Sequence, residues 1–92
     1  MIAKTYRISR AANIADAGAV DAEAAYRERT PDECYALLSR ASHAYGRASA
    51  EALVHGRDRQ GDAYQRQSDR LRRAARQVLR TGRAYADILR RG

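Results

Sequence analysis

Small and apolar residues recur between positions 34 and 55 at alternating intervals of four and three, the spacing of a helix face packed against a neighbour. A favourable start precedes them. Thr30 is a good N-cap, Pro31 suits the first helical position, and Glu33 completes a capping box. Gly56 marks the expected end, so we predict a helix over 31–55. Its core series is Cys34, Leu38, Ala41, Tyr45, Ala48, Ala52 and His55.

A second helix is predicted over about 62–90, where the same spacing returns. The segment 56–61 between the two helices holds two glycines and no large apolar residue, which is typical of a loop. Asp62 with Gln65 matches a second capping box, and Asp58 is an alternative start one turn earlier. The core series of this helix is Tyr64, Ser68, Leu71, Ala75, Val78, Gly82, Tyr85 and Leu89.

A loop this short requires the two helices to run antiparallel, as a hairpin. Folding the chain about the 56–61 loop pairs residues whose numbers sum to about 119 or 120. Each layer then sets a large residue against a small one, as close packing requires. In particular, Gly82→Leu is expected to overpack the layer that contains Leu38. The predicted pairs are Ala48 with Leu71, Tyr45 with Ala75, Ala41 with Val78, Leu38 with Gly82, and Cys34 with Tyr85.

The first thirty residues carry a weaker pattern. The four-three spacing continues, but mostly through alanine, and Gly18 weakens a helix by about 1 kcal/mol relative to Ala. We predict a helix over about 13–29, irregular near Gly18, after an extended arm over 1–12. Its series is Ile8, Ala12, Ala15, Ala19, Ala22 and Tyr26.

Together these elements predict one all-α domain over 1–92, a small three-helix arrangement dominated by an antiparallel hairpin with coiled-coil-like packing rich in Ala and Gly. Twenty Ala and no Phe or Trp leave little apolar area to bury, so we expect a homodimer or a place in a larger assembly. A single Cys, no secretory leader and no membrane-spanning run favour a cytoplasmic protein without membrane contact.

Catalytic chemistry has little support in the sequence. His43 and His55 are twelve residues apart, and no His or Cys cluster has metal-ligand spacing. Cys34 has no evident base, and no glycine-rich phosphate loop is present. We expect a protein that is not an enzyme and that uses no metal or cofactor.

The net charge of +7 lies entirely after His55, where there are eleven Arg and four Asp. On a continuous helix several of these arginines fall opposite the core series, along roughly 40 Å. Ion pairs within the helix are another explanation for some of these arginines. The pairs Asp62–Arg66, Asp69–Arg73 and Asp87–Arg91 have the favourable i,i+4 order, with the acidic residue first. The candidate binding residues are Arg66, Arg70, Arg73, Arg76, Arg80 and Arg83.

Two functions follow from this charge. The first is a helical binding protein whose Arg-rich face contacts a polyanion, with nucleic acid bound through its phosphates as the leading case. The alternative is a protein-interaction module, such as a phage- or plasmid-encoded inhibitor, antitoxin-like or accessory factor, docking on an acidic or nucleic-acid-binding surface. Only Tyr6 and Tyr35 fall outside the core series, so few rings are expected for stacking on bases. A helix-turn-helix and a membrane-surface helix fit less well, because the 34–55 series is continuous and bulky apolar residues are scarce.

Overall fold

The computed structural model describes residues 9–91, which form four helices: α2 (Arg10–Arg27), α3 (Pro31–Val54), α4 (Asp58–Thr81) and α5 (Tyr85–Arg91). No strand occurs in these residues, and the predicted all-α class is confirmed. Of the predicted extended arm, residues 1–8 lie outside the described part. Residues 10–12 are helical, contrary to that prediction, because the Ser9 side chain caps α2 by accepting a hydrogen bond from the Ala12 N–H at 3.0 Å.

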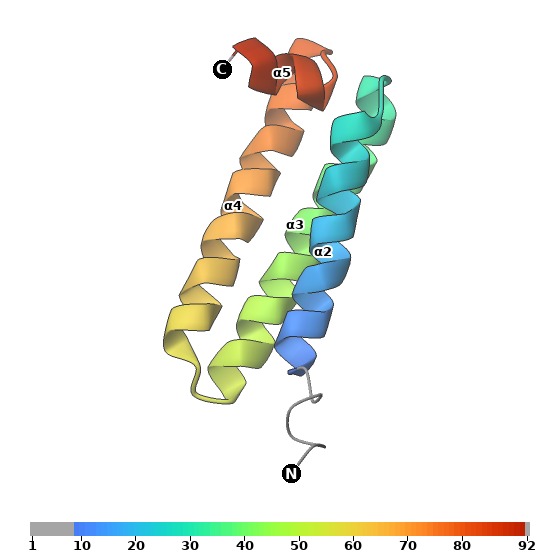
Figure 1. The fold of residues 1–92 in the computed structure, drawn as a ribbon. Coiled ribbons are helices and arrows are strands. Elements are labelled where there is room, and N and C mark those ends of the chain that lie inside the picture. The colour runs from blue at the N-terminus through green and yellow to red at the C-terminus, as the bar shows by residue number, and fades with distance from the viewer. Residues whose placement is uncertain (1–8, 92) are drawn as a thin grey trace.

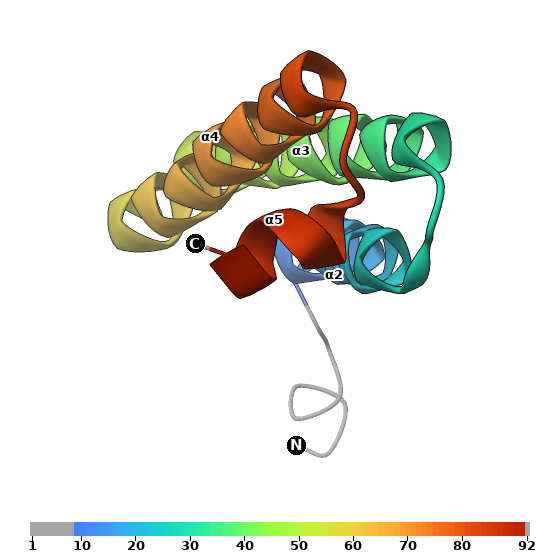
Figure 2. The same cartoon turned by 90° about the horizontal axis from the view of Figure 1, so that it is seen from above.

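The three long helices lie side by side, with α3 in contact with both α2 and α4 (Figure 1). The short α5 crosses the end of the molecule and contacts α2 and α4 (Figure 2). The described residues form an elongated body of 49 × 23 × 19 Å. Within it, no helix combines the length and the apolar character needed to cross a membrane.

The turn between α3 and α4 is shorter than predicted. It covers residues 55–57, with Gly56 at a φ of +72°, and α4 begins at Asp58, the alternative start, instead of at 62. Because the turn is centred earlier, the predicted register between α3 and α4 is wrong by about ten residues, between two and three helical turns. The Ser49 hydroxyl donates to the Gly61 carbonyl at 2.7 Å, a pair whose residue numbers sum to 110. Likewise, the ring of Tyr45 lies 6.2 Å from that of Tyr64 and does not form a layer with Ala75 as predicted.

Most of the two predicted core series is nevertheless buried. All its members in α3 up to Ala52 are buried, as are Ser68, Leu71, Ala75 and Val78 in α4. His55 is the exception in the first series. It is exposed beyond the end of α3, where its Nε2 lies 2.9 Å from Glu51. The 3.6-residue period therefore identified the buried faces correctly even though the register between them was wrong.

The predicted helix over 62–90 is interrupted at Gly82, which takes a left-handed φ of +67° and donates its N–H to the Val78 carbonyl at 2.9 Å. This is a typical helix C-terminus, and the chain then turns back to form α5. The predicted layer of Gly82 with Leu38 does not form, since no atom lies within 4 Å of a Cβ built at Gly82. Leu89 is 50% exposed, and Ile88 takes the buried position in α5.

In α2 the buried positions are one residue away from much of the predicted series. Ala11, Ala15, Gly18 and Ala25 are buried, whereas Tyr26 is 53% exposed. Gly18 is a point of close helix approach, because a Cβ there would lie 3.0 Å from the Tyr45 ring and 3.2 Å from the Ala41 carbonyl oxygen. The helix is continuous through this position, so the predicted irregularity near Gly18 is wrong.

Candidate functional site

Five of the six predicted binding residues lie on α4, and all six are exposed. Arg83 follows the end of α4, in the segment that leads to α5. From Arg66 to Arg80 the row rises about 21 Å, so it is shorter than the predicted 40 Å. The difference arises because α4 ends at Thr81, which also places Arg91 on the separate helix α5.

None of the three predicted i,i+4 ion pairs forms. Asp69 lies 3.8 Å from Arg72, and Asp87 pairs with Arg90, both at i,i+3. Across residues 9–91, the six candidate arginines have no carboxylate within 4.0 Å. The ion pairs of the other helices are Arg10–Glu51, Arg27–Glu23 and Arg40–Asp21. Arg29 and Arg47 also have no carboxylate within 4.0 Å among the described residues, but positive charge without a local partner is densest on α4 and just after it.

The candidate arginines of α4 do not all lie in one line along the helix. Arg66, Arg73 and Arg80 are seven residues apart, which aligns them along the outer face of α4. Arg70 lies to one side, towards α5: burial raises the pKa of the Tyr85 phenol, and the positive charge of Arg70 opposes that shift. Arg76 lies on the other side, next to α3.

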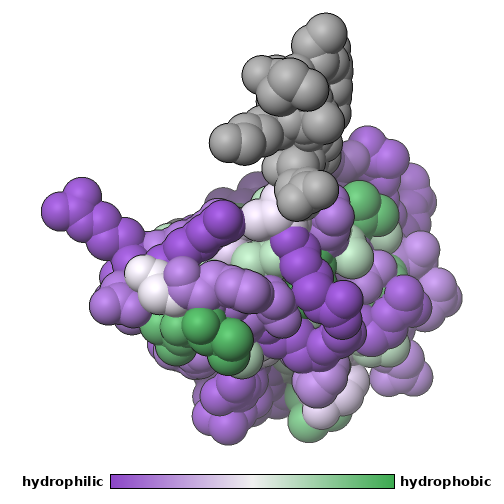
Figure 3. Space-filling view, turned by 90° about the horizontal axis from the view of Figure 1, so that it is seen from below, coloured by the Kyte–Doolittle hydropathy of each residue, from purple (hydrophilic) through white to green (hydrophobic). Residues whose placement is uncertain are grey.

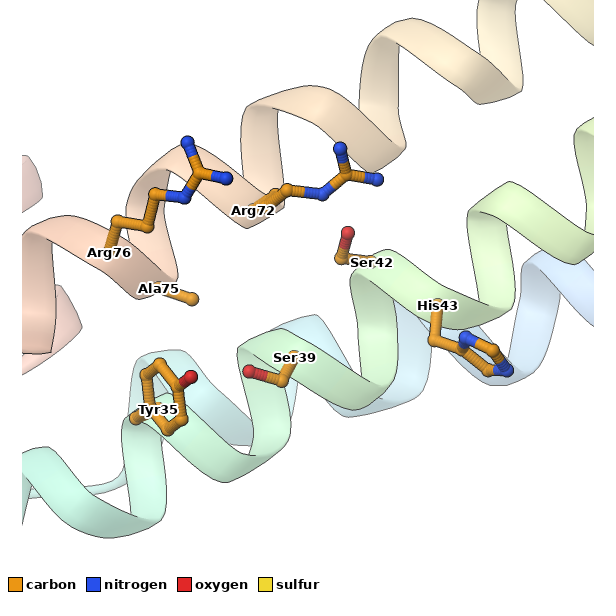
Figure 4. Close-up of a pocket in the computed structure, with 7 residues that line it drawn as sticks. All are labelled: Tyr35, Ser39, Ser42, His43, Arg72, Ala75 and Arg76. Carbon is orange, nitrogen blue, oxygen red and sulfur yellow. The ribbon is translucent and has the colours of Figure 1, made fainter.

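Arg76 and Arg72 line a cavity of about 360 Å³ between α4 and α3 (Figure 4). The α3 side of the cavity is formed by Tyr35, Ser39 and His43, which are spaced by four and so lie on one face of that helix. Of these, Tyr35 was noted in the sequence as a ring outside the core series and His43 was considered only for metal or catalytic chemistry, whereas Ser39 was not singled out. The spacing of four that these residues share is visible in the sequence. Which face of α4 they meet depends on the register between α3 and α4, which the sequence does not give.

A second cavity, of about 280 Å³, adjoins the first at Tyr35. Its other walls are mainly apolar and include Pro31, Val78 and Leu79, with Asp32 at the start of α3. Leu79 is 66% exposed. Tyr35 therefore stands between a cavity edged by guanidinium groups and one edged by apolar side chains.

A further cavity, of about 440 Å³, lies between the end of α2 and α5, where Tyr26 and three arginines share the lining with the carboxylates of Glu28 and Asp87. At the end where α3 joins α4, the surface is largely hydrophilic with small separate hydrophobic patches (Figure 3). Within residues 9–91, no group of three or more His, Cys, Asp or Glu is placed to hold a metal ion. Cys34 is buried where α2 meets α3, with its sulfur 3.4 Å from the carbonyl oxygens of Ala25 and Glu28. The Tyr85 N–H donates to the same sulfur at 3.5 Å, so the predicted pair of Cys34 with Tyr85 is in contact, through the start of α5.

The geometry of α4 can hold several anionic groups at once, because guanidinium groups bind phosphates and carboxylates in a fixed fork geometry. Comparison of this chain with protein-family models, with curated proteins and with solved structures finds no match.

Proposed function

We propose that this protein binds nucleic acid through the phosphate backbone, using the arginines of α4. The observation that carries the proposal is the contrast in ion pairing. Arg10, Arg27 and Arg40 each lie within 4.0 Å of a carboxylate, whereas the outer row of Arg66, Arg73 and Arg80 has no such partner among the described residues. Unpaired guanidinium groups keep their full charge available for an external anion.

The shape of α4 supports the same proposal. Its outer row is straight and about 21 Å long, and an exposed helix of this kind can lie along a nucleic-acid backbone. Contacts of this type neutralise phosphates and release counterions, so they depend strongly on salt and weakly on base sequence. Arg70 and Arg76 flank the row and extend the positive surface to both sides.

The test compares two triple variants that lose the same number of positive charges. The first is Arg66→Gln/Arg73→Gln/Arg80→Gln in the outer row. The second, the matched control, is Arg10→Gln/Arg27→Gln/Arg40→Gln at paired positions. Binding to a labelled duplex of about 20 base pairs is measured by fluorescence anisotropy from about 50 to 200 mM salt.

We expect the wild-type protein to bind with a steep salt dependence, and the outer-row variant to lose about three units of slope in the plot of log K against log salt concentration. The control variant should keep most of the slope. If the two variants weaken binding equally, the interaction follows overall charge and not α4. If the wild-type protein does not bind at low salt, the proposal fails.

A second candidate is an acidic protein partner. It is favoured by the exposed apolar side chain of Leu79 beside Arg76 and Arg80, since a phosphate backbone makes no use of apolar contacts. Charge reversal in Arg76→Glu/Arg80→Glu would then abolish capture of the partner while the helical circular dichroism signal is unchanged. The predicted homodimer or larger assembly stays a prediction, to be checked by light scattering of the purified protein.

A further inference from the structure

The groove between α3 and α4 has features that contact with a phosphate backbone alone does not require. Two adjoining cavities, of about 360 and 280 Å³, lie along it. Both are lined only by residues of α3 and α4 and by Gly82, which ends α4, so α2 and α5 leave this side uncovered. The larger cavity falls within the range of about 300–1,000 Å³ that is typical of small-ligand sites.

Tyr35 is the wall that the two cavities share. Its side chain is 39% exposed, and Figure 4 shows its ring extending from α3 towards α4. Free space on two sides of an aromatic ring allows a flat group to lie against it. Nucleic-acid bases are such groups, and stacking on an aromatic ring tolerates any base because each has a π-face.

The polar groups are distributed unequally between the two cavities. Arg72 and Arg76 extend along α4 at the rim of the larger cavity, with Ser39 across from them on α3, whereas the His43 ring points away from α4 (Figure 4). Arg72 forms an ion pair with Asp69 at 3.8 Å, whereas Arg76 has no carboxylate within 4.0 Å among residues 9–91. An anionic group is therefore favoured at the larger cavity, chiefly through Arg76.

The smaller cavity favours an uncharged, apolar group. Pro31, Val78 and Leu79 supply apolar walls, and the carboxylate of Asp32 disfavours a phosphate there. A nucleotide placed along the groove would thus have its phosphate at Arg76 and its base against Tyr35 and the apolar walls. In a duplex the base faces are already stacked and paired, so this arrangement requires an unpaired strand.

We propose that the α3–α4 groove binds single-stranded nucleic acid, with a base stacked on Tyr35 and the adjacent phosphates held by Arg76 and Arg72. This inference rests on the proposed function and specifies its substrate. It also gives the exposed Leu79 a role, as an apolar contact for the base.

The experiment measures the affinity of the full chain for a labelled mixed-sequence DNA strand of about 12 nucleotides, and for the same strand annealed to its complement. The test variant is Tyr35→Ala. Tyr35→Leu keeps apolar bulk without the ring, and Tyr35→Phe keeps the ring. Tyr26→Ala is the comparison variant, because Tyr26 is an exposed tyrosine on α2 that lines neither groove cavity. It lines a separate cavity of about 440 Å³ with Arg27, Arg29 and Arg90, and its ring contacts that of Tyr85, so it tests stacking at the other aromatic site next to arginines.

We expect Tyr35→Ala and Tyr35→Leu to bind the single strand about 5- to 100-fold more weakly, while Tyr35→Phe and Tyr26→Ala stay within about twofold of wild type. Duplex affinity should not depend on Tyr35. Circular dichroism checks that each variant is folded. If Tyr35→Ala is unfolded, the comparison of Tyr35→Leu with Tyr35→Phe tests the proposal.

The two proposals fail in different ways. If both probes bind with strong salt dependence but Tyr35→Ala and Tyr35→Leu have no effect, the groove inference is overturned and backbone binding by α4 survives. If neither probe binds at low salt, both proposals fail. If Tyr26→Ala weakens single-strand binding as much as Tyr35→Ala does, the stacking position is not the groove and the inference is overturned.

Discussion

Ser42 on α3 and Ser68 on α4 hydrogen-bond to each other reciprocally across the helix interface. Each hydroxyl donates to the other residue's backbone carbonyl oxygen at 2.8 Å, and the two hydroxyl oxygens are 3.2 Å apart. Both side chains are buried. Helices can approach closely where side chains are this small, and the paired hydroxyls fix which residues face each other.

The serine pair predicts that each hydroxyl contributes separately to stability. Ser42→Ala and Ser68→Ala should each lower the free energy of unfolding by about 1 kcal/mol, because each removes one buried hydrogen bond. In the double variant the two losses should add to within about 0.5 kcal/mol in urea denaturation, because each bond ends on a backbone carbonyl that the other substitution leaves in place. Ser39→Ala, on the neighbouring turn of α3, is the control and should change stability by less than about 0.5 kcal/mol. Losses in the single variants no larger than that of Ser39→Ala would contradict the two buried hydrogen bonds.

Two helical glycines should respond oppositely to alanine. A Cβ at Gly46 would lie 3.4 Å from the Ser68 hydroxyl, an ordinary contact, whereas one at Gly18 would lie 3.0 Å from the Tyr45 ring and 3.2 Å from a backbone oxygen. Gly46→Ala should therefore raise the free energy of unfolding by about 0.5–1 kcal/mol through helix propensity. Gly18→Ala should lower it, because overpacking costs about 1–3 kcal/mol. Equal stability of the two variants in urea denaturation would contradict the close approach of α2 to α3.

At Gly82 the cost of substitution should come from the backbone and not from packing. Because φ is +67° and no atom lies within 4 Å of the position that a Cβ would occupy, Gly82→Ala and Gly82→Leu should be destabilising by a similar amount, about 1–2 kcal/mol. Gly82→Asn should be milder, since Asn tolerates this conformation. Thermal and urea denaturation measure all three. A much larger loss for Leu than for Ala would indicate that Gly82 faces Leu38 after all.

Stability should fall at alkaline pH. Burial raises the pKa of the Tyr45 and Tyr85 phenols above the ordinary value of about 10. The unfolded chain therefore loses these protons at a lower pH than the folded protein. Their contribution is complete below about pH 10 and is lost as pH rises through the folded-state pKa values. Urea denaturation at a series of pH values above about 9 should show this decline, and Tyr45→Phe/Tyr85→Phe should reduce it. An unchanged decline in the double variant would contradict this assignment.

The start of α3 and the buried faces of α3 and α4 could be predicted because they depend on local sequence. Thr30 and Pro31 mark a helix start wherever the helix lies in the fold. The predicted capping box does not form, because the Thr30 side chain makes no capping bond to the backbone and donates instead to the Glu33 carboxylate at 3.0 Å. The 3.6-residue period likewise places Leu38, Tyr45 and the residues between them on one face before any partner is known. The exposure of the α4 arginines follows from the same period.

The register, the end of α4 and the groove were decided only by the tertiary structure. Glycine at position 82 fits either a tight packing layer or a helix C-terminus, and the sequence pattern favoured the wrong one. In the fold α5 turns back and packs on α2, where the rings of Tyr26 and Tyr85 meet edge to face with centroids 6.3 Å apart.

The same holds for the cavities beside Tyr35. They exist because the Ser42–Ser68 pair sets which turns of α3 and α4 face each other, which brings Arg76 opposite Ser39 and Tyr35. The sequence by itself determined the helices, their buried faces and the excess of arginine on one of them, because these depend on neighbours within a few residues. How the faces meet depends on contacts between residues about 26 positions apart, as in the Ser42–Ser68 pair, and a local period carries no information about them.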